Sequence, residues 1–397
     1  MKKLTQSPLD PEFTQNPYAL YAQVQAQDPL RFWQDYNMAA VFDAAQIQTF
    51  LKDRRLGRAI PAERKQPVPD HLTDFAALEA VSLLELEPPS HTRLRGLVLR
   101  AFTSRRIKAL GPDIHDICDS LISKFPEGSF DLLPTYCSAL PVRIIARLLG
   151  VPESMSADLL RWSNAMVAMY QAGRTREIEV EANQAALDFT NFLDGYIKER
   201  ENTPRDDLIT HLIAAEADGE KLTRREMIGT CVLLLNAGHE ATVHTLGNGV
   251  KALLENKTPR RALAPEHIAA TVEEILRFDP PLHIFTRYAY EDIMVGTQKL
   301  HIGDQIALVL GAAGRDVRKA PDADVFDPFR KNITHSAFGG GLHFCVGAPL
   351  ARMELQIGLQ KLFYAAPELE LTETPIYANS YHFHGLKRLR ITRQPSC

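Results

Sequence analysis

Residues 338–347 have the sequence FGGGLHFCVG, which surrounds one cysteine, Cys345, with glycines at 339–341 and 347. Glycines allow positive φ angles and close backbone approach, so this loop can direct several backbone N–H groups at one sulfur atom. The next residues, 348–363, have helically spaced apolar side chains and a proline near their start. We therefore expect Cys345 just ahead of a helix N-terminus, a position that favours a thiolate.

A glycine-rich loop before a helix can instead hold phosphate. This loop lacks the Gly-Lys-Ser/Thr ending of a P-loop, and Phe344 stands where the last glycine of a dinucleotide-binding loop belongs. A shielded thiolate is one form of axial ligand for haem iron, and His343 is placed to pair with a haem carboxylate.

Helical periodicity dominates the first two-thirds of the chain, and short alternating runs follow later. We predict one domain over residues 1–397, mainly α with small β-sheets. The predicted helices are 156–170, 179–200, 225–256, 265–278 and 348–363, and the predicted strands are 284–290, 305–310 and 386–391.

The charge balance argues against a nucleic-acid or polybasic membrane surface. The chain has 45 Lys and Arg against 49 Asp and Glu, for a net charge of −4. The longest apolar run, CVLLL at 231–235, is far shorter than the roughly 18 residues that span a bilayer. We expect neither a nucleic-acid partner nor a membrane partner.

The cysteines indicate a reducing compartment. They are five in number and scattered, with no pair at the spacing of a zinc or redox site: Cys118, Cys137, Cys231, Cys345 and Cys397. The first twenty residues contain no apolar core of the kind a signal peptide needs. A cytoplasmic location is the expectation.

The segment FGGGLHFCVGAPLARMEL, residues 338–355, resembles the haem-ligand signature of the cytochrome P-450 superfamily. The resemblance implies the fold of that family, with haem b (iron protoporphyrin IX) between the central long helix and the cysteine-loop helix. It implies that Cys345 is the iron ligand and that the chain is a monooxygenase of the soluble bacterial type. Such enzymes insert one atom of O2 into a C–H bond of a small organic substrate, with NAD(P)H electrons delivered by a ferredoxin and its reductase.

Further segments resemble the same family in the expected order. EEILR supplies Glu274 and Arg277, which with Arg330 are expected to form a buried structural network. PPSHTRLRGLVLRAFT, residues 88–103, resembles the helix that binds a haem propionate. The residues expected to contact the cofactor are His91, Arg95, Arg287, His343, Phe338, Gly347 and Ala237.

The central segment LLLNAGHEATVH resembles the family helix that passes over the iron, and Ala237 and Gly238 are small enough to let it kink there. Glu240 matches the family acid, but Ala241 stands where a threonine is usual, with Thr242 one place later. One residue rotates a side chain by about 100°, so Thr242 replaces that threonine poorly unless the helix is bulged. We hypothesise that a substrate hydroxyl or a pocket water, with Glu240, supplies the missing function.

Two other patterns in this region suggest different chemistry. HEATVH contains two histidines, but His239 and His244 are five residues apart, whereas a helical zinc site needs four. GNGVKA, residues 247–252, fits a dinucleotide fingerprint but lies within continuous helical periodicity.

Substrate identity should depend on five parts of the chain: roughly residues 56–86, the connection 165–180, Leu233 and Asn236 of the central helix, Leu282 to Phe285, and Tyr381 to Phe383. The predicted pocket residues are Leu233, Asn236, Leu282, His283, Phe285 and His382. Basic side chains near the cysteine loop, namely Arg93, Arg105, Arg106, Lys108 and Arg352, could bind an acidic redox partner. Two other functions stay open: a haem-thiolate protein that only senses or carries a gas, and a nucleotide-dependent dehydrogenase. Product formation driven by NAD(P)H would distinguish the monooxygenase from a protein that senses or carries a gas. A visible haem absorption band would exclude the dehydrogenase.

Overall fold

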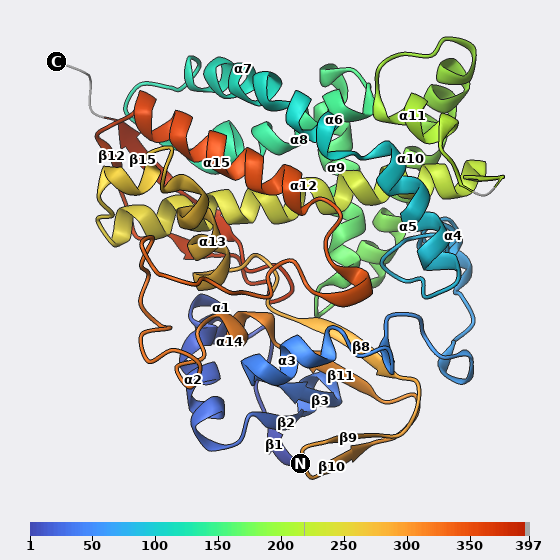
Figure 1. Ribbon diagram of the computed structural model, residues 1–397, viewed down its shortest axis with the longest axis vertical. Coiled ribbons are helices and arrows are strands. Elements are labelled where there is room, and N and C mark those ends of the chain that lie inside the picture. The colour runs from blue at the N-terminus through green and yellow to red at the C-terminus, as the bar shows by residue number, and fades with distance from the viewer. Residues whose placement is uncertain (218, 394–397) are drawn as a thin grey trace. The chain divides into compact units, whose positions relative to one another are not determined.

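The computed structural model describes residues 1–217 and 219–393 (Figure 1). The helices are α1 (Pro11–Gln15), α2 (Pro17–Gln27), α3 (Ala44–Phe50), α4 (Thr73–Glu79), α5 (Ser90–Ala101), α6 (Ser104–Ala109), α7 (Gly111–Ile122), α8 (Ala139–Leu149), α9 (Ser156–Val167), α10 (Arg176–Asn202), α11 (Leu208–Ala214), α12 (Arg224–Glu255), α13 (Ile268–Phe278), α14 (Leu310–Gly314) and α15 (Ala348–Ala365). The strands are β1 (Lys2–Leu4), β2 (Leu30–Trp33), β3 (Met38–Val41), β4 (Leu56–Gly57), β5 (Ser129–Asp131), β6 (Glu216–Ala217), β7 (Glu220–Lys221), β8 (Phe285–Ala289), β9 (Ile293–Val295), β10 (Gln298–Leu300), β11 (Gln305–Leu308), β12 (Leu369–Leu371), β13 (Ile376–Tyr377), β14 (Leu386–Arg388) and β15 (Arg390–Arg393).

The chain packs into two compact units, and neither is one continuous stretch of sequence. The first contains residues 1–57, 118–138 and 241–397, and the second contains residues 58–117 and 139–240. The long helix α12 begins in the second unit and ends in the first, because the boundary falls between Glu240 and Ala241.

The main sheet of the first unit has six strands in the order β1-β2-β3-β11-β8-β4 (Figure 1). Strand β1 is parallel to β2 and β11 is parallel to β3, whereas the remaining pairs are antiparallel. Successive residues of β3 alternate between two apolar cores: Ala39 and Val41 join one, and Met38 and Ala40 join the other. Because both faces are buried, this strand is continuously apolar, as expected for a covered sheet.

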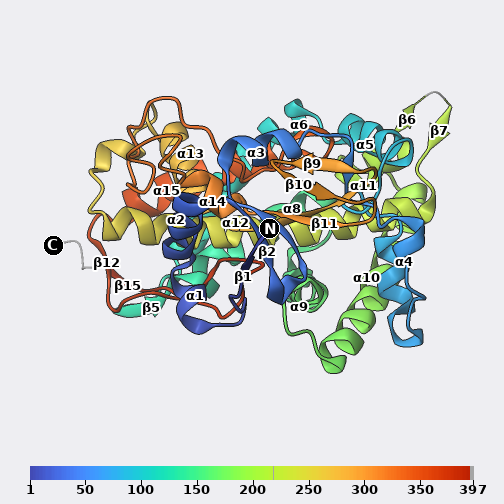
Figure 2. The ribbon, with the colours of Figure 1, turned by 90° about the horizontal axis from the view of Figure 1, so that it is seen from below.

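The second unit is built from helices. Helices α9 and α10 lie side by side, with α4 against α10 (Figure 2). Trp162 of α9 packs edge-on against Phe189 of α10, with 5.0 Å between ring centroids. The end of α10 is fixed by Arg200, whose buried guanidinium donates to Asp207 and to the Gly150 carbonyl.

The prediction of a mainly helical chain with small sheets is confirmed. Each of the five predicted helices corresponds to an observed helix, and residues 247–252 lie inside α12, which excludes a dinucleotide-binding turn there. Among the residues that the structure describes, no helix combines the length and apolar character needed to cross a membrane.

Candidate active site

Cys345 lies in a tight loop that ends at the first turn of α15. Its backbone N–H donates to the Phe338 carbonyl at 3.0 Å. Gly347 is the N-cap residue of α15, and a Cβ at this position would lie 3.8 Å from the Cys345 sulfur. The thiol is therefore held two residues before a helix N-cap, as predicted, and the partial positive charge of the helix end favours its anionic form.

The glycines of the loop have different tasks. Gly339 and Gly341 have positive φ angles of 69° and 63°, the conformation that favours glycine. Gly340 is extended and Gly347 has an α-helical φ of −79°, so the positive φ that glycine allows is adopted at two of the four positions. Gly340 instead permits close packing, because its Cβ would lie 3.1 Å from that of Leu51.

The other described thiols are buried and poorly acidic. Burial raises the pKa of Cys118 to about 11 and that of Cys231 to about 12, and raises that of Cys137 further. Cys345 is only partly buried. Cys397 lies outside the described residues. Of the described cysteines, Cys345 is thus the one that a ligand can reach as a thiolate.

A brace that the sequence reasoning missed ties the cysteine loop to α13. Arg352 of α15 donates to both oxygens of Glu273, at 2.6 and 2.9 Å, and its guanidinium lies 4.5 Å from the centre of the Phe338 ring. His335 Nε2 lies 3.0 Å from the same carboxylate. Burial opposes ionisation of Glu273, but Arg352 and His335 outweigh it and lower its pKa to about 2. Arg352 is therefore used inside the molecule, which the prediction of a partner-binding role did not anticipate.

The structure brings Glu274, Arg277 and Arg330 together. Arg277 donates from Nε and Nη2 to the two Glu274 oxygens, both at 2.7 Å, and Arg330 Nε approaches Glu274 at 3.4 Å. Arg277 also donates to the backbone carbonyls of Gly314 and Ala323. The network thus links α13 to the chain that leads into the cysteine loop.

One strip of α12, near the middle of the helix, is partly uncovered. Ala237 is exposed, while Leu233, Ala241 and His244 are half-buried, and these four residues recur at steps of three and four. The helix also passes close to α8, because a Cβ on Gly238 would lie 2.8 Å from Cδ1 of Ile145. A strip of small and half-buried side chains is a suitable surface for a flat cofactor or a small ligand.

Helix α12 is α-helical from end to end, with no bulge at the position of the expected threonine. Thr242 is buried, with 4% of its surface exposed, so it does not take the place of Ala241 on the uncovered face. His239 points elsewhere: its Nδ1 lies 2.9 Å from the Leu235 carbonyl, and its Nε2 lies 3.3 Å from Glu240.

The four basic residues predicted to bind propionates are found in both units. In the second unit His91 is buried and Arg95 half-buried, four residues apart on α5. In the first unit Arg287 is buried on β8, and His343 closes a short 3-10 turn in the cysteine loop.

The basic residues predicted to bind a redox partner fall into two groups. Arg93 forms ion pairs with Glu226 and Glu220, and Arg106 donates to the Ala101 carbonyl. Arg105 and Lys108 are exposed. Intramolecular contacts thus already use most of this group.

The predicted pocket residues differ in how they are placed. Leu282, Phe285 and His382 are half-buried in the first unit. Asn236, in the second unit, is half-buried, with its amide 3.7 Å from the Met166 sulfur. His283 is fully buried and its ring nitrogens face two tyrosine hydroxyls, so neither is directed at a ligand.

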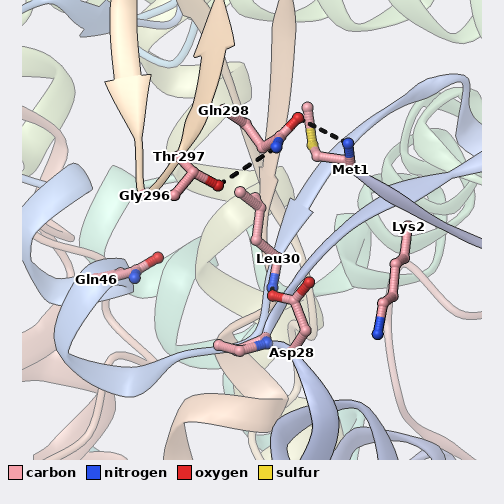
Figure 3. Close-up of a pocket in the computed structure, with 9 residues that line it drawn as sticks. Met1, Lys2, Asp28, Leu30, Gln46, Gly296, Thr297 and Gln298 are labelled. Atoms are coloured by element: carbon pink, nitrogen blue, oxygen red, sulfur yellow. Dashed lines mark hydrogen bonds between the residues drawn. The ribbon is translucent and has the colours of Figure 1, made fainter.

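A shallow groove of about 410 Å³ near the N-terminus contains none of the predicted site residues (Figure 3). The terminal amino group donates to Gln298 Oε1 at 2.7 Å there, and Gln298 donates to Thr297 at 3.4 Å. Met1, Gln298 and Thr297 thus bond to one another at the edge of this groove.

The comparisons with known proteins agree with this arrangement. The family model described as Cytochrome P450 matches residues 165–365. The chain is 35% identical to "Vitamin D(3) 25-hydroxylase" of Pseudonocardia autotrophica, over 96% of this chain and 95% of that protein.

The chain belongs to the cytochrome P450 family.

Further relatives and solved P450 structures cover nearly the whole chain. The "Polyketide biosynthesis cytochrome P450 PksS" of Bacillus subtilis is 34% identical over 94% of both chains. The structure of P450BioI in complex with acyl carrier protein ligated to hexadec-9Z-enoic acid matches with a TM-score of 0.90 and 30% identity, over 97% of this chain and 99% of that chain. The structure of CYP109E1 from Bacillus megaterium with corticosterone matches with a TM-score of 0.84 and 29% identity, over 96% of this chain and 99% of that one.

Members of the cytochrome P450 family bind haem, and this chain is a P450 monooxygenase, an oxidoreductase. The residues present fit that cofactor. In the first unit, Cys345 offers a partly buried sulfur that could bind the haem iron, and Gly347 adds no bulk beside it, since a Cβ there would lie 3.8 Å from this sulfur. Ala241 of α12, in the same unit, is small and half-buried.

Proposed function

We propose that this P450 inserts one oxygen atom of O2 into a C–H bond of a small organic substrate. The electrons originate from NAD(P)H and arrive through a ferredoxin and its reductase, in the cytoplasm. The observation that supports the proposal most is the Cys345 loop, in which a half-buried thiol stands ahead of a helix N-terminus. Bound haem activates O2, and its thiolate ligand supplies electron density that favours O–O cleavage.

The residues of this chain divide the remaining tasks between them. Cys345 would bind the iron, Phe338 and Gly347 would shape the loop around the sulfur, and the small Ala237 would leave space for the cofactor. Propionate binding falls to four basic residues, His91, Arg95, Arg287 and His343. The guanidinium groups of the two arginines can form paired bonds with a carboxylate, and each histidine ring can donate one hydrogen bond. Glu274, Arg277 and Arg330 support the cysteine loop and take no part in chemistry.

Proton delivery is the step in which this chain departs from its family. Gly238 and Glu240 keep the family residues, but Ala241 provides no hydroxyl and Thr242 is turned into the core. We propose that Glu240 acts with a substrate hydroxyl or an ordered water in this position. The substrate contacts would come from Leu233, Asn236, Leu282, Phe285 and His382.

A second candidate is oxidation of a chain carried on an acyl carrier protein. It is favoured by the similarity to P450BioI, whose structure contains an acyl carrier protein carrying a fatty acyl group. The two candidates separate when turnover of free fatty acids, steroids and macrolactones is compared with turnover of the same acyl chain on a carrier protein.

The test of the proposed function is reconstitution with ferredoxin, ferredoxin reductase and NADPH. The expected result is substrate-dependent NADPH oxidation with one atom of 18O2 in the product. Haem binding without any oxygenated product across a broad substrate panel would instead support a protein that senses or carries a gas.

A further inference from the structure

A buried polar cluster lies in the first unit, beside the two segments predicted to line the substrate pocket. It joins helices α1 and α2 to the chain after α13 and to the loop between β13 and β14. Its side chains are Tyr18, Tyr21, Asp279, His283, Tyr377, Tyr381 and His384. Asp279, His283 and His384 are buried, with 3%, 0% and 0% of their surface exposed.

The centre of the cluster is a carboxylate with three donors. Asp279 Oδ1 accepts from Tyr18 at 2.6 Å and from His384 Nδ1 at 2.9 Å, and Oδ2 accepts from Tyr377 at 2.5 Å. Burial opposes ionisation of this group, but the charge and hydrogen bond of His384, with Arg315, outweigh it and hold the pKa of Asp279 well below its usual value. The carboxylate is thus ionised and fully bonded.

His384 faces an acceptor on each side. Its Nε2 lies 3.1 Å from the Thr14 carbonyl, while its Nδ1 faces Asp279. A carbonyl and a carboxylate only accept, so both ring nitrogens of His384 are placed to donate.

The same logic orients the hydroxyl groups. Tyr18 has one proton and gives it to Asp279, so at 3.3 Å it accepts from His283 Nε2. Nδ1 of His283 then accepts from Tyr21 at 2.8 Å, and Tyr21 accepts from Tyr381 at 2.6 Å. Burial, followed by the nearby charge of His384, lowers the pKa of His283 well below its usual value, in agreement with a neutral ring.

The ligand atoms of Asp279, His283 and His384 lie within 4.8 Å of one another, as they would in a metal site. Each of them already has a hydrogen-bond partner among the described residues, and His384 Nδ1 carries a proton where a metal would bind. The cluster is complete as a chain of hydrogen bonds.

Two wall segments, residues 282–285 and 381–383, are joined to this cluster. Their backbones meet at a bridge between Leu282 and Phe383, and the His384 N–H donates to the Pro281 carbonyl at 2.9 Å. Leu282 and Phe285 are half-buried on either side of the buried His283 and Ile284, and His382 and Phe383 are half-buried between the buried Tyr381 and His384. Each segment therefore combines residues buried in or beside the cluster with half-buried residues that are not part of it.

We propose that this cluster fixes the position of the two wall segments and thereby determines how large a ligand the pocket accepts, with His283, Tyr21 and Tyr381 acting as positioning residues that do not touch the substrate. The inference rests on the proposed function, because it takes these segments as walls of the substrate pocket. Loss of one hydroxyl from this chain of hydrogen bonds leaves the rings packed but allows the wall segments to move. A bulky ligand in contact with these segments must then order them, which weakens its binding.

The test compares the haem-loaded protein with its Tyr381→Phe variant, which lacks the last hydroxyl in the chain of hydrogen bonds. The probes are imidazole and the bulky azole clotrimazole, whose dissociation constants follow from the shift of the Soret band. We expect the affinity for clotrimazole relative to imidazole to fall about fivefold, equivalent to the roughly 1 kcal/mol of one hydrogen bond. Tyr21→Phe should act in the same direction and serves if Tyr381→Phe does not fold.

The matched control is Tyr136→Phe, which also removes a buried tyrosine hydroxyl, but one outside the cluster. This hydroxyl donates to the Gly358 carbonyl at 2.7 Å. It should leave the affinity ratio unchanged. An unchanged ratio in Tyr381→Phe, or an equal change in the control, overturns the inference while a normal carbon monoxide band leaves the proposed function intact. Zinc that purifies in equal amount with the chain and is lost in His384→Gln would also overturn it.

Discussion

Replacement of Glu274 by glutamine should destabilise the protein strongly. Glu274 is fully buried and accepts two bonds from Arg277, one from the Asp327 N–H at 2.8 Å, and a longer one from Arg330. Glutamine keeps one acceptor but turns an amide N–H toward a guanidinium N–H. It also leaves the buried charge of Arg277 uncompensated.

The expected cost follows from this geometry. Breaking a buried ion pair by removing one partner costs about 3 to 5 kcal/mol, whereas an exposed pair contributes roughly 1 kcal/mol or less. The Arg277 side chain is 5% exposed and that of Glu274 is 0% exposed, so the buried case applies. We expect a loss of about 3 to 5 kcal/mol in the free energy of unfolding.

The assay is urea unfolding followed by circular dichroism at neutral pH. Asp158→Asn is the matched control, because Asp158 and Arg161 form an ion pair at the same three-residue spacing but are 46% and 60% exposed. The control should change the unfolding free energy by less than about 0.5 kcal/mol. A change below about 1 kcal/mol for Glu274→Gln would refute the claim that this network stabilises the fold.

Three further predictions concern the cysteine loop and α12. Arg352 and His335 outweigh burial and lower the Glu273 pKa to about 2, so the brace stabilises the protein above about pH 4.5 and is lost as the pH falls toward 2. Glu273→Gln should cost about 1 kcal/mol at pH 7 and less at pH 3, where the stabilisation is partly lost, measured as urea midpoints. An equal loss at both pH values would contradict the brace. Gly341→Ala should cost about 2 kcal/mol or more, because φ is +63° and the new Cβ would lie 2.5 Å from the Leu51 carbonyl oxygen. The control Gly128→Ala has the same backbone strain, but no atom lies within 4 Å of its Cβ, so it should cost about 1 kcal/mol. An equal fall of the two thermal midpoints would refute the close contact at Gly341. Ala241→Thr should not improve the yield of product per NADPH on the native substrate, and a marked improvement would argue against a substrate hydroxyl or water in that role.

The helices could be predicted because their periodicity is local. The spacing of apolar residues in 225–256 and 348–363 predicts α12 and α15 to within about two residues of their ends. The six-stranded sheet could not be predicted in this way. It pairs β3 with β11, and their Cα partners Ala39 and Ile306 are separated by most of the chain, so no short window of sequence contains the signal.

The site residues show the same division. The position of Cys345 follows from its glycines and the helix after it, which are adjacent in sequence. The Glu273 brace and the pairing of Asp279 with His384 depend on contacts between distant segments, and a lone histidine gives no sign of its partner. His283 illustrates the difference, since its place in a wall segment could be predicted but the direction of its ring could not.

The central claim is that the Cys345 thiolate ligates haem iron, and one spectrum tests it most directly. Carbon monoxide added to the dithionite-reduced protein should move the Soret band to the long-wavelength position typical of thiolate ligation. Cys345→Ser should lose that band. Cys118→Ser should keep it, because Cys118 is buried and its sulfur lies at hydrogen-bond distance from the Tyr136 hydroxyl in the core. A wild-type spectrum without the shift, or a Cys345→Ser protein that retains it, would contradict the account.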